Sequence, residues 1–126
     1  MELLLNTALG ARIAARIGNE SVDLDAPHLI DVEVTQVIRR YLRAGGISEE
    51  TAAIALGHWR DLDVERHAHE PYLDRIWQLR GNFSAYDASY VALAEVLGVP
   101  LLTTDSGLAG AVGSHASIEL MAIAHQ

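Results

Sequence analysis

The sequence contains no cysteine and no lysine, and it has no long run of apolar residues. Without cysteine the chain cannot form a disulfide framework, a thiolate metal site or a cysteine nucleophile, which fits a reducing cytoplasm. No apolar stretch approaches the roughly 20 residues that span a bilayer, and no basic segment precedes a secretory-type apolar core. We therefore expect a cytoplasmic protein that has no membrane partner.

The charge of the chain limits how it can bind nucleic acid. The net charge is −8, and all nine basic residues are arginine. Such a chain is poorly suited to wrapping a nucleic acid, because that binding depends on many phosphate-neutralising cations. A nuclease whose metal ions meet the phosphate is still compatible with this charge. Arg39, Arg40 and Arg43 cluster on one predicted helix, where they either contact phosphate or form a solvated face, and the pattern slightly favours the solvated face.

The length and the alternation of apolar residues indicate one α/β domain. The 126 residues are half hydrophobic and one fifth charged, which excludes a disordered chain. Strand and helix patterns alternate, so we expect a parallel sheet joined by right-handed crossovers. The predicted elements before residue 84 are a helix over 2–17, a strand around 22–26, a helix from Pro27 to Gly45, a helix from Ser48 to about Trp59, a strand over 62–67 and a helix from Pro71 to Gly81. In the last of these helices Tyr72, Ile76, Trp77 and Leu79 are predicted to face inward. A final strand is predicted over 118–123.

The stretch from Ser84 to Asp105 carries the strongest functional signal. Ser84 has the pattern of a helix cap, Asp87 falls in the first helical turn, and Gly98 ends the helix before a short apolar strand. Asp105 follows this strand directly, at the kind of sheet edge where ligands gather. Ordinary cap and turn chemistry also explains each acid taken singly.

Two quoted stretches connect the chain with a known family. YDASYVALAE followed by TTD, and APHLIDVEVTQVIRRYLRAGGIS upstream, closely resemble PIN-domain ribonucleases, in particular the VapC toxins of bacterial VapBC toxin–antitoxin pairs. The resemblance covers nearly the whole chain. It implies that 1–126 form a single PIN-like domain, a three-layer sandwich with a mostly parallel central sheet flanked by helices. The family's first strand, which ends in an Asp, has no counterpart, and we expect the true start to lie upstream of Met1.

Three carboxylates on separate elements are the candidate catalytic residues. Converging carboxylates repel one another unless a cation neutralises them, and an all-oxygen set selects Mg²⁺ or Mn²⁺ over zinc. Such ions suit phosphodiester hydrolysis. Asp31 and Glu33 both lie near a helix start, where either can be structural, and Glu33 is the one that matches the family's acid. The resemblance implies that Glu33, Asp87 and Asp105 are catalytic metal ligands and that the Thr103 hydroxyl hydrogen-bonds a ligand or a metal-bound water.

The same resemblance implies the partners of the protein and leaves two functions open. It implies an RNA substrate, neutralisation by a VapB-like antitoxin, and a homodimer. The first function is a Mg²⁺- or Mn²⁺-dependent endoribonuclease toxin, and the alternative is a catalytically inactive PIN-like protein that only binds an antitoxin or other partner. A small-molecule phosphatase is disfavoured because no DxDxT motif or glycine-rich phosphate loop is present. The spacing of His67, His69 and Glu70 matches no zinc motif, which favours a strand-end loop over a metal site.

Overall fold

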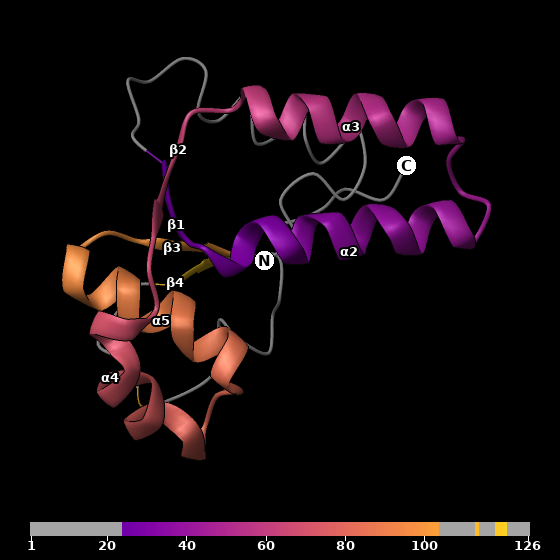
Figure 1. Cartoon of the computed structure of the whole chain (residues 1–126). Helices are drawn as coiled ribbons and strands as arrows, with labels where there is room; N and C mark the ends of the chain where they lie inside the picture. The colour runs from indigo at the N-terminus through magenta and orange to yellow at the C-terminus, as the bar shows by residue number, and fades with distance from the viewer. Residues whose placement is uncertain (1–23, 104–112, 114–117, 121–126) are drawn as a thin grey trace. The chain divides into compact units, whose positions relative to one another are not determined.

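The structure, a computed structural model, describes residues 24–103, 113 and 118–120 (Figure 1). The predicted helix over 2–17 and the candidate acid Asp105 lie outside the described residues. The helices and strands follow one another as β1 (Leu24–Pro27), α2 (Leu29–Arg43), α3 (Glu49–Asp61), β2 (Val64–His67), the 3₁₀ turn η1 (Glu70–Tyr72), α4 (Leu73–Gln78), the 3₁₀ turn η2 (Leu79–Gly81), α5 (Ala85–Leu97), β3 (Leu101–Thr103) and β4 (Ile118–Leu120).

The four strands in the described residues form two pairs, and the chain divides into two compact units. β1 pairs with β2, and β3 pairs with β4 in parallel, with Leu101 opposite Ile118 and Thr103 opposite Leu120. One unit contains α5, β3 and β4 with the helical turns before them, and the other contains α2 and α3. The parallel pair and the helices between strands confirm the predicted mixed α/β class.

Helix α2 forms because apolar residues recur along one side of it. Ile30, Val34, Val37 and Ile38 are buried, as the periodicity predicts. The predicted start at Pro27 is wrong, because Pro27 is the last residue of β1 and the helix begins at Leu29. The fixed φ of proline also suits an extended strand end, where no ladder N–H is required.

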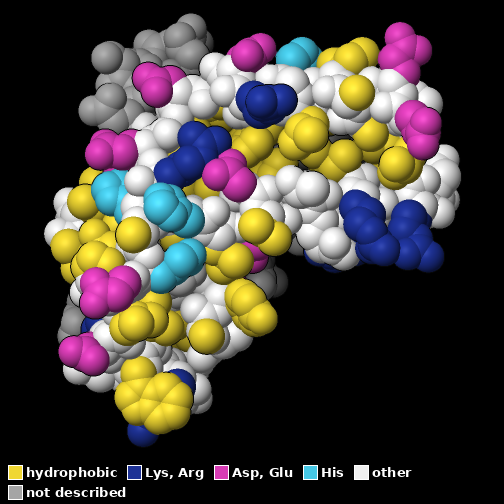
Figure 2. Space-filling view, in the orientation of Figure 1, with side chains coloured by type: hydrophobic (Ala, Val, Ile, Leu, Met, Phe, Trp, Pro, Cys, Tyr) yellow, Lys and Arg dark blue, Asp and Glu magenta, His cyan; other side chains and the backbone are white. Residues whose placement is uncertain are grey.

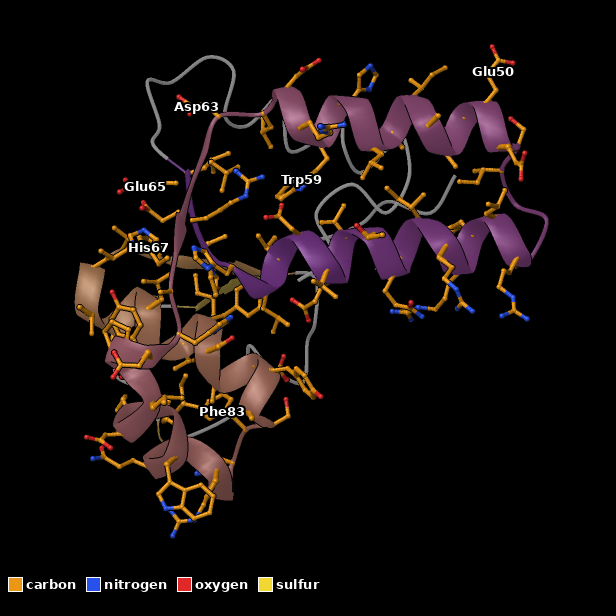
Figure 3. The ribbon with its side chains drawn as sticks, viewed as in Figure 1. Glu50, Trp59, Asp63, Glu65, His67 and Phe83 are labelled. Carbon is orange, nitrogen blue, oxygen red and sulfur yellow. The ribbon has the colours of Figure 1, made fainter. Side chains whose placement is uncertain are left out.

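Helix α3 has the predicted cap and a buried contact with α2. The Ser48 side chain accepts a hydrogen bond from Thr51 N at 3.1 Å, which satisfies one of the unpaired donors of the first turn. Near the other end, Trp59 is only 2% exposed, and its Nε1 donates to Asp31 Oδ1 on α2 at 2.7 Å. Figure 3 shows Trp59 pointing from α3 towards α2. This bond fixes the start of α2 against the end of α3.

The segment after β2 is less regular than predicted. A 3₁₀ turn, the short helix α4 and a second 3₁₀ turn replace a single helix. The prediction that Trp77 faces inward is wrong, because Trp77 is 66% exposed while Leu79 is buried. Residues two apart on a helix point about 160° apart, so a helix that buries Leu79 turns Trp77 away from the core. The Arg80 guanidinium lies 4.3 Å from the Trp77 ring centroid, so a cation–π contact covers part of the exposed ring.

Helix α5 is the most buried helix that the structure describes. The Ser84 side chain accepts from Asp87 N at 3.1 Å, and every residue from Ala88 to Ala94 is buried. The helix ends at Gly98, whose φ of 65° lies in the left-handed region that favours glycine. Both ends therefore form where the sequence predicts them.

An ion pair joins α4 to α5. Arg75 Nε and Nη2 donate to the two Glu95 carboxylate oxygens at 2.7 and 2.9 Å, a bidentate arrangement. The hydrogen bond to Glu95 raises the pKa of Arg75, although partial desolvation opposes the rise. Because the Glu95 side chain is only 10% exposed, this pair is better shielded from solvent than an ordinary surface ion pair. It holds α4 on the helix that carries Asp87.

Candidate functional site

Asp87 lies in the first turn of α5, a helix with a capped start and a buried body. It is half-buried, and its own backbone N–H donates to the Ser84 cap. The positive end of the helix dipole stabilises a carboxylate at this position. The buried run that follows leaves the helix little freedom to move, and Phe83, also buried, precedes the cap (Figure 3). The cap, the dipole and the buried helix therefore all favour a fixed carboxylate.

The two acids at the start of α2 have different surroundings. Asp31 accepts the hydrogen bond from the buried Trp59 indole, and its backbone carbonyl accepts from the Thr35 hydroxyl at 2.7 Å. This contact gives Asp31 a structural role. Glu33 is half-buried, two residues further along the same helix. Glu33 stays the predicted metal ligand because it is the acid that matches the family's motif.

The remaining predicted site residues lie at the end of β3. Thr103 is the last residue of this strand, and Asp105, two residues on, lies outside the described residues. Glu33 and Asp87 belong to different units, so each is described within its own element. The prediction that the three acids converge therefore stays a prediction. The parallel pairing of β3 with β4 does place Thr103 at the carboxyl end of a parallel strand, where ligands commonly bind.

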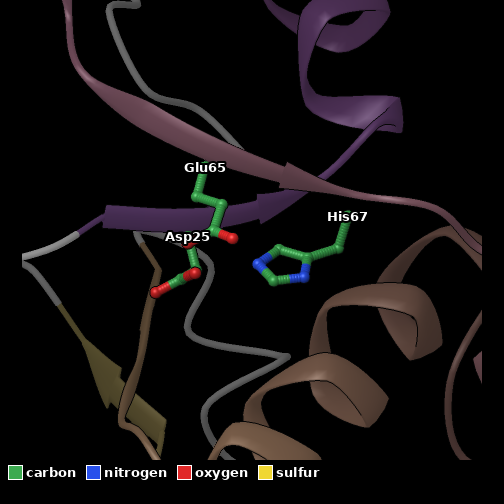
Figure 4. A group of neighbouring side chains, drawn as sticks. All are labelled: Asp25, Glu65 and His67. Carbon is green, nitrogen blue, oxygen red and sulfur yellow. The ribbon is translucent and has the colours of Figure 1, made fainter.

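A group of three possible ligands on β1 and β2 was not found from the sequence. Asp25, Glu65 and His67 each offer a ligand atom, and these atoms lie within 4.8 Å of one another (Figure 4). Residues two apart on a strand share one face, so the sequence could have predicted that Glu65 and His67 lie side by side. It could not have predicted that Asp25, on another strand, lies beside them. The group could hold a divalent cation. Exposed carboxylates such as Glu65 are common without an ion, and we base no function on this group.

The other histidines near β2 have different surroundings. His69 precedes η1, and its ring lies edge-on to that of His28, with 6.4 Å between the ring centroids. His67 is the last residue of β2, within the predicted strand over 62–67, and His69 and Glu70 follow that strand, where the sequence predicted a strand-end loop. The residue that joins His67 in the ligand group is Glu65 rather than His69 or Glu70.

None of the helices in the described part of the chain is both long and apolar enough to cross a membrane.

The fold and the candidate residues define an α/β protein with carboxylates placed near helix starts, and comparison with known proteins gives its family. No family model matches the chain. The chain is 41% identical to ribonuclease VapC12 of Mycobacterium tuberculosis strain H37Rv over 122 residues, which cover 97% of this chain and 93% of that protein. It is 43% identical to ribonuclease VapC1 of the same strain over 122 residues, covering 96% of this chain and 91% of that protein.

A third relative, ribonuclease VapC9 of the same strain, is 44% identical over 82 residues, 65% of each chain. Identity at this level over nearly the full length of two relatives is decisive. The chain belongs to the VapC family of PIN-domain proteins. The resemblance seen in the YDASYVALAE and DVEV stretches is thereby confirmed at the level of the family.

Proposed function

We propose that this protein is a metal-dependent endoribonuclease toxin that hydrolyses RNA phosphodiester bonds. The observation that carries the proposal is the identity of 41% and 43%, over nearly the whole chain, to two proteins that are named ribonucleases. The local structure around Asp87 and Glu33 supports it, because both carboxylates lie on well-packed helices and neither is fully buried. A fixed, solvent-reachable carboxylate is what a metal ligand in a hydrolase requires.

The residues present fit Mg²⁺ or Mn²⁺. Glu33, Asp87 and Asp105 offer only carboxylate oxygens, the ligands that these hard cations prefer, and the chain has no cysteine to favour softer metals. These three residues would hold the ion, and the Thr103 hydroxyl would orient a ligand or water beside it. A bound ion of this kind lowers the pKa of water and stabilises the charge that develops on the phosphate.

The protein's own contribution is to place the ligands before the substrate arrives. The Ser84 cap and the buried body of α5 hold Asp87, and the bond from Trp59 to Asp31 holds the start of α2, on which Glu33 lies. Preorganised charges need no rearrangement during the reaction, which is the main way in which a protein lowers such a barrier. The packing of α5 and α2 therefore serves the chemistry as well as stability.

The proposal includes the partners and location that the family implies. We expect a VapB-like antitoxin to neutralise the activity, a homodimer to be the functional assembly, and the protein to act in the cytoplasm. An arginine of the antitoxin would complement a cluster of carboxylates, because guanidinium and carboxylate form bidentate pairs. Membership of the VapC family, which the identities to ribonucleases VapC12 and VapC1 show, supports these expectations.

The test of this function is cleavage of single-stranded RNA by the purified full chain. We expect cleavage with Mg²⁺ or Mn²⁺, loss of cleavage in EDTA, and recovery when Mn²⁺ is added in excess, because the carboxylates need the cation to act. An Asp87→Asn protein purified in parallel shows whether a contaminating nuclease is present. Cleavage that persists in EDTA would refute the metal dependence. A folded protein that cleaves no RNA with either ion would instead support the binding-only alternative.

A further inference from the structure

The C-terminal end of α2 carries an exposed cluster of arginines. Arg39, Arg40 and Arg43 are all exposed, and Figure 2 shows basic side chains gathered at this end of the helix. In the part of the chain that the structure describes, no hydrogen bond or ion pair involves any of the three side chains. They are three of only nine basic residues in a chain of net charge −8. These guanidinium groups are therefore exposed and form no ion pair with a carboxylate of the described residues.

Arg40 lies on the same side of α2 as Glu33, and Arg43 lies about a quarter-turn further round its exposed surface. An α-helix turns once every 3.6 residues, so Arg40, seven residues after Glu33, lies about 20° from it around the axis and about 10 Å along it. Arg43 lies about 15 Å along and about 80° round. The buried side chains of Ile30 and Val34 lie about 60° and 100° from Glu33 in the other direction, so Glu33 is at the edge of the buried face and the arginines continue around the exposed side. These angles and distances follow from the geometry of α2 alone.

We propose that Arg40 and Arg43 bind phosphate groups of the RNA strand that is cut, so that the strand runs along α2 with its scissile phosphate near Glu33. The inference rests on the proposed function. An acidic protein repels RNA, and a local cationic surface is needed beside the carboxylates to hold the strand. Guanidinium groups suit this role because they bind phosphate in a bidentate manner. Arg39 lies about 120° from Glu33 around the helix and is not assigned this role.

If Arg40 and Arg43 have only a structural role, their replacement should change the stability of the protein and not its binding of RNA. Cations in the last turn of a helix interact favourably with its dipole, and Arg40 and Arg43 are in the last turn of α2. Arg60 is the matched case, because it is exposed, lies in the last turn of α3 and belongs to the same unit. Its replacement tests the dipole effect without touching the Glu33 side of α2.

The experiment measures binding of a fluorescein-labelled single-stranded RNA to the full chain across a range of salt concentrations, with Ca²⁺ in place of Mg²⁺ to limit cleavage. The double variant Arg40→Gln/Arg43→Gln is expected to bind at least about tenfold more weakly, and the slope of log affinity against log salt should fall in magnitude by about 1.4, or 0.7 per phosphate. Arg60→Gln should change neither quantity. Arg40→Lys/Arg43→Lys should keep the salt slope, because lysine retains the charge.

Cleavage kinetics separate failure of this inference from failure of the proposed function. With Mg²⁺, the double glutamine variant should raise KM and leave kcat nearly unchanged, as expected for a contact made equally in the bound and transition states. A variant that keeps the wild-type KM and salt slope, while the wild type cleaves RNA, overturns the inference alone. Unchanged RNA binding with lost binding of an acidic protein partner also overturns it. A wild-type chain that neither binds nor cleaves RNA overturns both.

Discussion

Asp87→Asn is expected to lower the rate of RNA cleavage by at least about 100-fold, because charge stabilisation by a bound metal contributes several kcal/mol to such a barrier. Asparagine keeps the shape of the side chain but removes the charge that would bind the cation. The cap from Ser84 to the Asp87 backbone N–H does not depend on the side chain and should persist. Stability should fall only by about 0.3–1 kcal/mol, the usual contribution of an acid at a helix N-terminus.

Asp74→Asn is the matched control for this variant. Asp74 is also an acid in the first turn of a helix, is exposed, and lies in the same unit as Asp87. Initial rates of cleavage of one labelled RNA, with unfolding curves in urea, give both quantities for both variants. Comparable activity of Asp87→Asn and Asp74→Asn would remove Asp87 from the site.

Glu33→Gln is expected to lower the cleavage rate, whereas Asp31→Ala is expected to lower the stability of the protein. The comparison tests whether Glu33 is the metal ligand and Asp31 the structural acid on α2. Glu33→Gln should lower cleavage by at least about 100-fold through loss of a metal ligand, with little effect on stability. Asp31→Ala should retain most of the cleavage rate and lose about 1.5–3 kcal/mol of unfolding free energy. This is the usual cost of removing a hydrogen bond to a charged group and leaving a buried donor unpaired.

The physical basis of this contrast is the bond from Trp59 Nε1 to Asp31 Oδ1, since nothing replaces the acceptor in the alanine variant. Asp31→Asn keeps an oxygen at the same place and should recover part of the stability. Cleavage rates and denaturant midpoints measured on the same preparations separate the two effects. If Asp31→Asn abolished cleavage while Glu33→Gln did not, the two assignments would have to be exchanged.

Local signals in the sequence predicted the helices that carry the site. Ser48 and Ser84 cap their helices, and Gly98 ends α5, because each feature depends on residues within a single turn. The apolar face of α2 was likewise predicted from periodicity, and comparison with VapC12 and VapC1 confirmed the family. Glu33, Asp87 and Asp105 were assigned through that resemblance, and their convergence stays a prediction.

Features that depend on contacts between distant residues were not predicted. The bond between Asp31 and Trp59 joins residues 28 apart in the sequence, so the sequence alone left the roles of Asp31 and Glu33 open. The inward orientation predicted for Trp77 was wrong because the rest of the fold buries the side of the helix that carries Leu79, and a residue two positions earlier lies on the other side. The pairing of β1 with β2, which brings Asp25 beside Glu65, is also a tertiary event.

The measurement that tests the central claim most directly is the affinity of the full chain for Mn²⁺. The electron paramagnetic resonance signal of the free ion monitors how much Mn²⁺ remains unbound. The claim is that Glu33 and Asp87 hold the metal, and it predicts that Glu33→Gln and Asp87→Asn each weaken binding by at least about tenfold, since even outer-shell changes cost this much. Asp74→Asn should bind as the wild type does. Equal Mn²⁺ affinity in all four proteins would contradict the claim, and loss of binding in Asp25→Asn alone would place the metal on β1 and β2 instead.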